Sequence, residues 1–192
     1  MNLTESLDLY IKYLTYEKNL SKTSVISYKK DIEQFTEYLL KQHGSKESPE
    51  TGAISLENFR KYLKEIDFSR YSKNTVIRKY SSLKSFFKFL ENNEILSGSI
   101  SSYIIPPKKD AHLYSFLSQP EINKVLSCID AGAANGIRDR ALIEFIYSTG
   151  TRVSEVENLK NSDIDIEKNE AKVLGKGRKP RNVYLNSQAA YW

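Results

Sequence analysis

Residues 147 to 165 read YSTGTRVSEVENLKNSDID and contain the clearest helix boundary in the chain. Gly150 suits the left-handed conformation that ends many helices, so a helix over about 137–148 is predicted to end there. A further short helix is predicted to begin around Arg152. Its inward side chains are predicted to be Val153, Val156 and Leu159.

Arg152 follows a helix-capping glycine and lies near a helix start, where free amides and the helix dipole favour an anion. A guanidinium there can bind two phosphate oxygens in a fixed geometry. The same arginine can instead form a structural salt bridge with Glu155. The residues around Arg152 leave both interpretations open.

The N-terminal half is predicted to be a bundle of four helices, because apolar residues recur at intervals of three and four. The first helix covers about 4–18, and the other three follow the cap residues Ser21, Ser55 and Ser72. Aromatic residues on these apolar faces are interpreted as core rather than as platforms for stacked bases.

The pattern changes at about residue 97, where serines and a proline pair interrupt the helical period. We therefore expect a helical domain over 1–96, a linker over 97–117 and a second domain over 118–192. Ser118 and Glu121 form a capping-box sequence that opens the second domain. Strands are predicted over 171–174 and 182–185, followed by the start of another helix near the end of the chain.

Positive charge is concentrated in two segments of a chain whose formal net charge is +5. Residues 57–88 contain nine basic and three acidic side chains, for a net charge of +6, and residues 172–181 contain five basic side chains and no acid. A basic side on a helical domain suggests a phosphate backbone as partner, although an ordinary solvated face has the same composition. The cations considered for DNA contact are Lys73, Arg78, Lys79, Lys84, Lys88, Arg178, Lys179 and Arg181.

Lys176 lies between Gly175 and Gly177 at the predicted hairpin tip, where the backbone can approach a bulky ligand. An ammonium near a phosphodiester can stabilise developing charge or donate a proton to a departing alkoxide. A solvated turn lysine is the alternative. The spacing differs from that of a nucleotide-binding loop, so hydrolysis of nucleoside triphosphates is not supported.

Other classes of protein receive little support from the composition. One cysteine and two histidines do not suggest a zinc site, and Cys128 is interpreted as a buried structural thiol. Neither a signal peptide nor a long apolar run is present, so we expect a cytoplasmic protein without membrane contact. We also expect no metal and no cofactor.

Two C-terminal stretches, IRDRALIEFIYSTGTRVSEVENLKNSDID and VLGKGRKPRNVYL, closely resemble the tyrosine recombinase or phage integrase family, with its Xer-like and integrase-like members. LSKTSVISYKKDIEQFTEYL and SKNTVIRKYSSLKSFFKFL resemble the helical core-binding domain of that family, and PPKKDAHLYSFLSQPEI resembles its interdomain linker. The resemblance implies a mainly α fold: a four-helix, SAM-like core-binding domain, then the first part of an α+β catalytic domain with a small β-hairpin.

The resemblance also implies a clamp on double-stranded DNA, other recombinase subunits on the same DNA, and cleavage by a tyrosine that forms a 3′-phosphotyrosyl bond. Arg152 matches the first catalytic arginine, which grips the scissile phosphate. Glu155 matches the supporting acidic position, and Lys176 matches the hairpin lysine that acts as general acid. Arg178, Lys179 and Arg181 are assigned to the DNA backbone.

This sequence departs from the family pattern after the hairpin, since no His-x-x-Arg motif and no late nucleophilic tyrosine is present among its 192 residues. Tyr184 and Tyr191 come too early for the nucleophile position. We therefore expect a truncated or partial recombinase that binds DNA without recombining it. The alternatives are an inactive DNA-binding protein that occupies recombination sites or modulates a full-length recombinase, and a helical interaction module without a nucleic-acid role.

Overall fold

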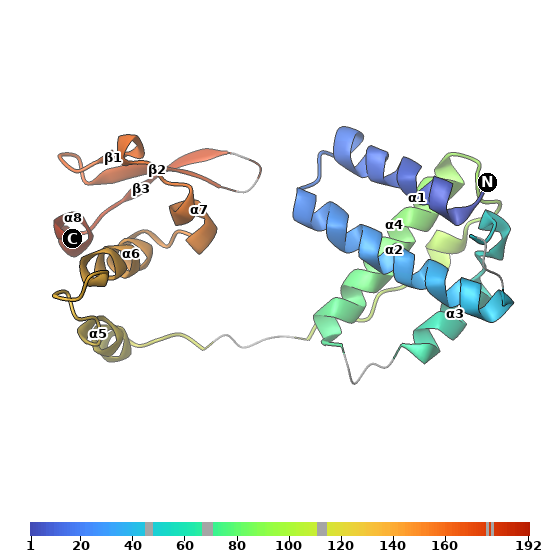
Figure 1. The fold of residues 1–192 in the computed structure, drawn as a ribbon, viewed down its shortest axis with the longest axis horizontal. Helices are drawn as coiled ribbons and strands as arrows, with labels where there is room; N and C mark the ends of the chain where they lie inside the picture. The colour runs from blue at the N-terminus through green and yellow to red at the C-terminus, as the bar shows by residue number, and fades with distance from the viewer. Residues whose placement is uncertain (45–47, 67–70, 111–114, 176, 178) are drawn as a thin grey trace. The chain divides into compact units, whose positions relative to one another are not determined.

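The computed structural model describes residues 1–44, 48–66, 71–110, 115–175, 177 and 179–192. The chain divides into two compact units, Met1–His112 and Leu113–Trp192, which Figure 1 draws with their helices and strands. Each unit has a hydrophobic core of its own. No described helix combines the length and the apolar character that crossing a bilayer requires.

The first unit is helical, and the predicted four-helix organisation is confirmed over its described residues. In Figure 1, α4 crosses α1 and α2, and it contacts both helices. The elements in chain order are α1 (Leu3–Lys12), the π-helical turn η1 (Tyr13–Glu17), α2 (Lys22–His43), the 3-10 turn η2 (Thr51–Ala53), α3 (Leu56–Glu65), α4 (Lys73–Asn92) and the 3-10 turn η3 (Ile100–Tyr103).

Serine side chains set the starts of three helices in this unit. The Oγ atoms of Ser21, Ser55 and Ser72 accept hydrogen bonds from backbone N–H groups three residues later, at 3.3, 3.0 and 3.3 Å. Each bond satisfies an N–H group that the first helical turn leaves without an intrahelical acceptor. At the other end of α2, Gly44 has a φ of 60° and ends the helix in the left-handed conformation.

Aromatic rings from several helices fill the core of the first unit. Phe35, Phe86 and Phe87 are fully buried, and the ring centroids of Phe35 and Phe87 lie 5.6 Å apart. Tyr10 of α1 contacts Phe86 with a centroid distance of 5.2 Å. Such pairs contribute roughly 0.5–1.5 kcal/mol beyond their buried area. The interpretation of these aromatic residues as core is confirmed.

The segment after α4 folds back along that helix. Glu91 accepts hydrogen bonds from the backbone N–H and the hydroxyl group of Ser101, at 2.8 and 2.5 Å. Lys84 Nζ donates to the backbone oxygen of Ile104 at 2.8 Å, and the Ile104 side chain is buried. The first part of the stretch expected to be a linker therefore packs on the first unit.

The second unit combines short helices with a small antiparallel sheet of order β1-β2-β3. Ala171 pairs with Val183 and Leu174 pairs with Pro180, so β2 and β3 form the predicted hairpin. The elements are α5 (Gln119–Ser127), α6 (Gly136–Thr149), α7 (Val153–Glu157), the 3-10 turn η4 (Asn161–Asp163), β1 (Ile164–Asp165), β2 (Glu170–Leu174), β3 (Pro180–Tyr184) and α8 (Ser187–Tyr191). β1 was not predicted, because two residues are too few to show a period.

Side chains alternate between the two faces of the hairpin, and one face packs against α6 and α8. Buried residues on β2 alternate with exposed ones, and Ala171 and Val173 face the core. Phe145 of α6 and Ala189 of α8 belong to the same core cluster. The sheet and these two helices therefore hold the junction between α6 and α7 in place.

Two predicted core positions in this unit are wrong. Val153 is 73% exposed, because α7 contains only five residues and Glu155, rather than Val153, occupies the buried position in this turn. Cys128 is exposed, because it caps the C-terminal end of α5 beyond Leu126, the buried residue of that helix.

We expect Phe87→Ala to lower the free energy of unfolding of the first unit by about 3–5 kcal/mol, because it removes a fully buried ring. Urea denaturation followed by circular dichroism measures the loss. Trp192, the only tryptophan, lies in the second unit, and its fluorescence transition should stay unchanged. Lys88→Ala, at the exposed neighbouring position, should change stability by about 0.5 kcal/mol or less. Equal effects of the two substitutions would contradict the packing described for Phe87.

Candidate active site

The turn between α6 and α7 fixes the backbone of Arg152. Gly150 has a φ of 62°, and its N–H group donates to the backbone oxygen of Ile146 at 2.9 Å. The hydroxyl oxygens of Thr149 and Thr151 lie 2.9 Å apart, and Thr151 is buried. Arg152 then takes the extended conformation of a helix N-cap, with φ −79° and ψ 150°. The predicted helix end at Gly150 is confirmed.

The buried carboxylate of Glu155 binds the residue at the start of its own helix. Glu155 is 6% exposed. Its Oε2 atom accepts from the backbone N–H of Arg152 at 3.0 Å, and Oε1 accepts from Arg152 Nη1 at 2.9 Å. The backbone contact satisfies one of the free N–H groups at the start of α7.

Arg181 of β3 binds the same carboxylate from the sheet. Its Nη1 and Nη2 atoms donate to Oε1 and Oε2 of Glu155 at 3.0 and 2.7 Å, a two-point contact of the kind that arginine and carboxylate favour. The hydrogen bonds from Arg181, with that from the Arg152 backbone next, lower the pKa of Glu155 from 4.5 to about 2. Glu155 therefore connects α7 to β3 as an ionised group.

Gly175 leaves space for this ion pair. A methyl group at position 175 would lie 3.0 Å from Arg181 Nη1 and 3.7 Å from Glu155 Oε1. The first distance is shorter than an ordinary van der Waals contact, so an alanine would push the guanidinium away. Gly175 thus leaves room for the Arg181 guanidinium, and this role is separate from the predicted approach of a ligand to the hairpin tip.

Arg152 keeps most of its guanidinium at the surface while it pairs with Glu155. Its side chain is 70% exposed, whereas that of Glu155 is 5% exposed. The salt-bridge interpretation and the phosphate interpretation of Arg152 are therefore compatible, because one guanidinium edge contacts Glu155 and other donors face solvent.

Two family models match the chain. The model of the phage integrase N-terminal SAM-like domain matches residues 7–94, and the model of the phage integrase family matches residues 115–192. The chain belongs to the tyrosine recombinase family. The predicted family and fold class are confirmed.

Recombinase relatives match almost the whole chain. It is similar to tyrosine recombinase XerC of Anoxybacillus flavithermus, with 34% identity over 188 residues, which are 98% of this chain and 61% of that relative. It is also similar to tyrosine recombinase XerC of Bacillus licheniformis, with 35% identity and coverage of 98% and 60%. The chain spans about three fifths of the length of these relatives.

A solved structure supports the same fold. A lambda integrase tetramer bound to a Holliday junction matches with a TM-score of 0.70 and 18% identity, over 98% of this chain and 53% of that chain. At this identity the likeness concerns the fold.

The β2–β3 hairpin carries the other basic residues expected for a recombinase site. Lys176 and Arg178 lie outside the described residues. Gly177 between them has a φ of 75°, a conformation that glycine adopts readily. Lys179 is exposed. Arg181, which the sequence assigned to DNA, donates hydrogen bonds from both of its terminal nitrogens to Glu155. Among the described cations of this hairpin, Arg181 is therefore the one that binds Glu155.

The basic residues of α4 have different environments. Lys73 pairs with Asp110, Lys84 donates to the Ile104 backbone and Lys88 is exposed. Lys79 requires a correction. It was considered for DNA contact, but its side chain is 2% exposed and pairs with Asp31 inside the unit. The charge count of a segment does not show which side chains reach the surface.

Sequence reasoning missed Asp31, which lies on α2 between inward-facing residues and is 1% exposed. Its signal was its position on the apolar stripe, four residues before Phe35. A carboxylate at such a position needs buried partners. Arg78 and Lys79 of α4 supply them.

Other kinds of site find little support in the described part of the chain. No three His, Cys, Asp or Glu residues there are arranged to hold a metal ion. Tyr184 and Tyr191 are 70% and 78% exposed and lie on β3 and α8.

We expect Glu155→Gln to lower the melting temperature of the second unit at pH 7. Because the folded-state pKa of Glu155 lies below its ordinary value of 4.5, ionised Glu155 stabilises the fold above about pH 4.5, and this contribution is lost as the pH falls toward 2. The difference between wild type and E155Q should therefore shrink over that range. Trp192 fluorescence follows the transition.

The matched control is Glu157→Gln, which removes the same charge from an exposed position on α7. It should show a smaller effect at pH 7. A difference between wild type and E155Q that stays constant down to pH 2.5 would rule out a stabilising role of the ionised carboxylate.

Proposed function

We propose that this chain is a site-specific DNA recombinase polypeptide that binds duplex DNA and supplies the first part of a strand-cleaving site. The observation that carries the proposal is the position of Arg152, which is held by buried Glu155 while its guanidinium remains 70% exposed. The similarity to tyrosine recombinases over 98% of this chain supports it.

In the proposed reaction, Arg152 binds non-bridging oxygens of the scissile phosphate and stabilises the negative charge that grows on them. Lys176 donates a proton to the departing 5′ oxygen. A tyrosine phenolate from outside these 192 residues attacks phosphorus, so that a 3′-phosphotyrosyl bond forms and the bond to the 5′ oxygen breaks. Glu155 positions Arg152 and does not contact the phosphate.

We propose a DNA-binding core-binding domain over 1–96, a linker over 97–117 whose first part packs on that domain, and part of a catalytic domain over 118–192. The family models, which match 7–94 and 115–192, support this division. The remaining proposed backbone contacts are Lys73, Arg78, Lys84, Lys88, Arg178, Lys179 and Arg181, of which Arg181 also binds Glu155. The similar lambda integrase is a tetramer bound to a Holliday junction, which supports assembly of this chain with other recombinase subunits.

We expect the chain to retard duplex DNA in a gel, with an affinity that falls steeply with salt because bound counterions are released. The slope of log K against log salt should be about −0.9 per phosphate neutralised. Lys88→Gln, in the segment of net charge +6, should reduce the slope by about one such step. Lys12→Gln removes the same charge outside that segment and should change the slope less. Binding that does not respond to salt would refute the electrostatic argument.

We also expect the 192 residues alone to form no covalent adduct with DNA. A phenol must be aligned with a phosphate that several groups hold, and this sequence has neither the His-x-x-Arg motif nor the late tyrosine of the family. The substrates are duplexes that are first selected for binding to the chain. A nick is then placed in each, so that a cleaved strand cannot be rejoined. Denaturing electrophoresis detects the adduct. An adduct trapped on any of the 13 tyrosines would show that the chain contains its own nucleophile.

A further inference from the structure

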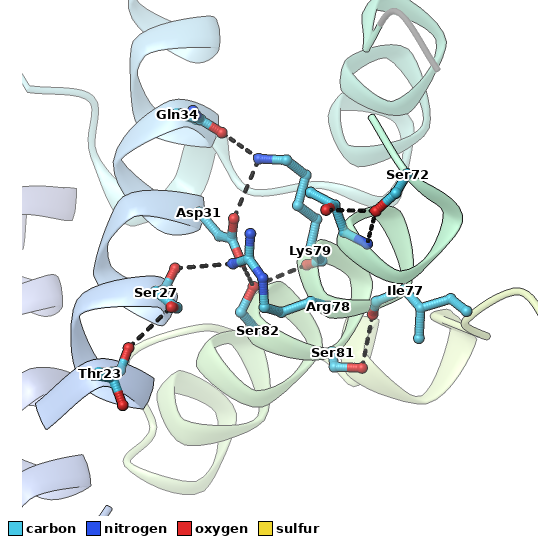
Figure 2. A network of polar contacts seen from close by, with 11 residues as sticks. Thr23, Ser27, Asp31, Gln34, Ser72, Ile77, Arg78, Lys79, Ser81 and Ser82 are labelled. Carbon is cyan, nitrogen blue, oxygen red and sulfur yellow. Dashed lines mark hydrogen bonds and ion pairs between the residues drawn. The ribbon is translucent and has the colours of Figure 1, made fainter. Parts of the chain in front are cut away.

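A buried carboxylate connects the two helices that cross in the first unit. Asp31 of α2 is 1% exposed and accepts hydrogen bonds from three residues of α4. Arg78 Nη1 donates to Oδ2, Lys79 Nζ donates to Oδ1 at 3.2 Å, and Ser82 Oγ donates to Oδ2 at 2.9 Å. Figure 2 shows the four side chains at the helix crossing.

The two cations of this cluster have different surroundings. Lys79 is 2% exposed, and its ammonium lies between Asp31 and the side-chain oxygen of Gln34. It also lies 5.0 Å from the ring centroid of Tyr71. The charge of Lys79 is thus enclosed by the protein. Arg78, by contrast, is 38% exposed.

Two acceptors fix the guanidinium of Arg78 from its inner side. Nη1 donates to Asp31 and also to the backbone oxygen of Ser27 at 3.2 Å. A guanidinium is planar, so contacts to two acceptors restrict both its position and its plane. The exposed remainder of the side chain is therefore presented to solvent in a limited range of orientations.

The cluster has a surplus positive charge. Within the described residues, Asp31 is the only carboxylate at salt-bridge distance from Arg78 or Lys79, so two cations share one anion. Lys79 is enclosed, so the surplus is accessible at Arg78. An anion is the ligand that complements a half-exposed guanidinium with surplus charge.

We propose that Asp31 is a positioning residue that orients Arg78 for contact with a phosphate of duplex DNA, while Lys79 balances the buried charge. The proposal rests on the proposed DNA-binding function and assigns a new role to an acidic residue within it. It gives Arg78 a different role from the other cations of α4, because Asp31 and the Ser27 backbone hold its guanidinium in one orientation.

The test uses the full chain and begins from Lys79→Met, which removes the buried ammonium and preserves side-chain volume. Asp31→Leu in that background removes the carboxylate without leaving a buried cation unpaired. Simple electrostatics and positioning predict opposite results. Losing a negative charge should tighten binding to a polyanion, whereas losing the orientation of Arg78 should weaken it by roughly three- to tenfold, as expected when one long side chain must be ordered on binding.

Fluorescence anisotropy with a labelled duplex at fixed salt measures the difference between D31L/K79M and K79M. Weaker binding supports the proposal, and equal or tighter binding overturns it. In a background that also contains Arg78→Gln, the Asp31 substitution should no longer weaken binding. Asp31→Asn with K79M retains an acceptor oxygen and the side-chain volume, and it should give a smaller loss. This variant also serves if the leucine variant does not fold.

Glu91→Gln is the matched control, because it removes one negative charge from the same unit at a residue that contacts Ser101 rather than a cation. It should leave binding unchanged or slightly tighter. Nitrogen-15 relaxation of Arg78 Nε gives a readout without DNA, and its order should fall in D31L/K79M. Unchanged order overturns the positioning role alone, whereas a wild-type chain that does not bind DNA overturns the proposed function.

Discussion

A carboxylate that is removed from water keeps its charge only where cations and N–H donors replace the lost hydration. Both units of this chain depend on that constraint. Asp31, Glu144 and Glu155 are 1%, 3% and 6% exposed, and each pairs with arginine. The Asp31 and Glu155 pairs join residues 47 and 26 positions apart in the sequence. Each of these two acids therefore fixes the packing of separate elements and the orientation of the basic side chains that bind it.

The consequence is clearest in the second unit, where one carboxylate connects the start of α7 to the sheet. Arg181 approaches Glu155 from β3, and Gly175 leaves the space that its guanidinium occupies. The position of Arg152 thus depends on the hairpin as well as on its own helix. In the proposed recombinase reaction, this arrangement orders the phosphate-binding arginine before DNA arrives, which lowers the entropy lost on binding.

In the first unit, the same constraint separates basic residues that look alike in the sequence. Arg78 and Lys79 are neighbours on α4, yet Arg78 is 38% exposed and Lys79 is 2% exposed. The difference comes from helix geometry, because successive residues point about 100° apart around the axis. One side chain therefore enters the crossing with α2, and the other lies at its edge. A count of positive charges describes the segment but not the surface.

The sequence by itself determined the helices, their caps and the hairpin, because these depend on local signals such as Ser72, Gly150 and the alternation of apolar residues. The stretch around Arg152, combined with the hairpin sequence and the order of the domains, was sufficient to indicate the family. Only the tertiary structure decided that Arg181 binds Glu155 and that Lys79 pairs with Asp31. These contacts join residues that are distant along the chain, and no local pattern specifies which buried acid a given cation will meet.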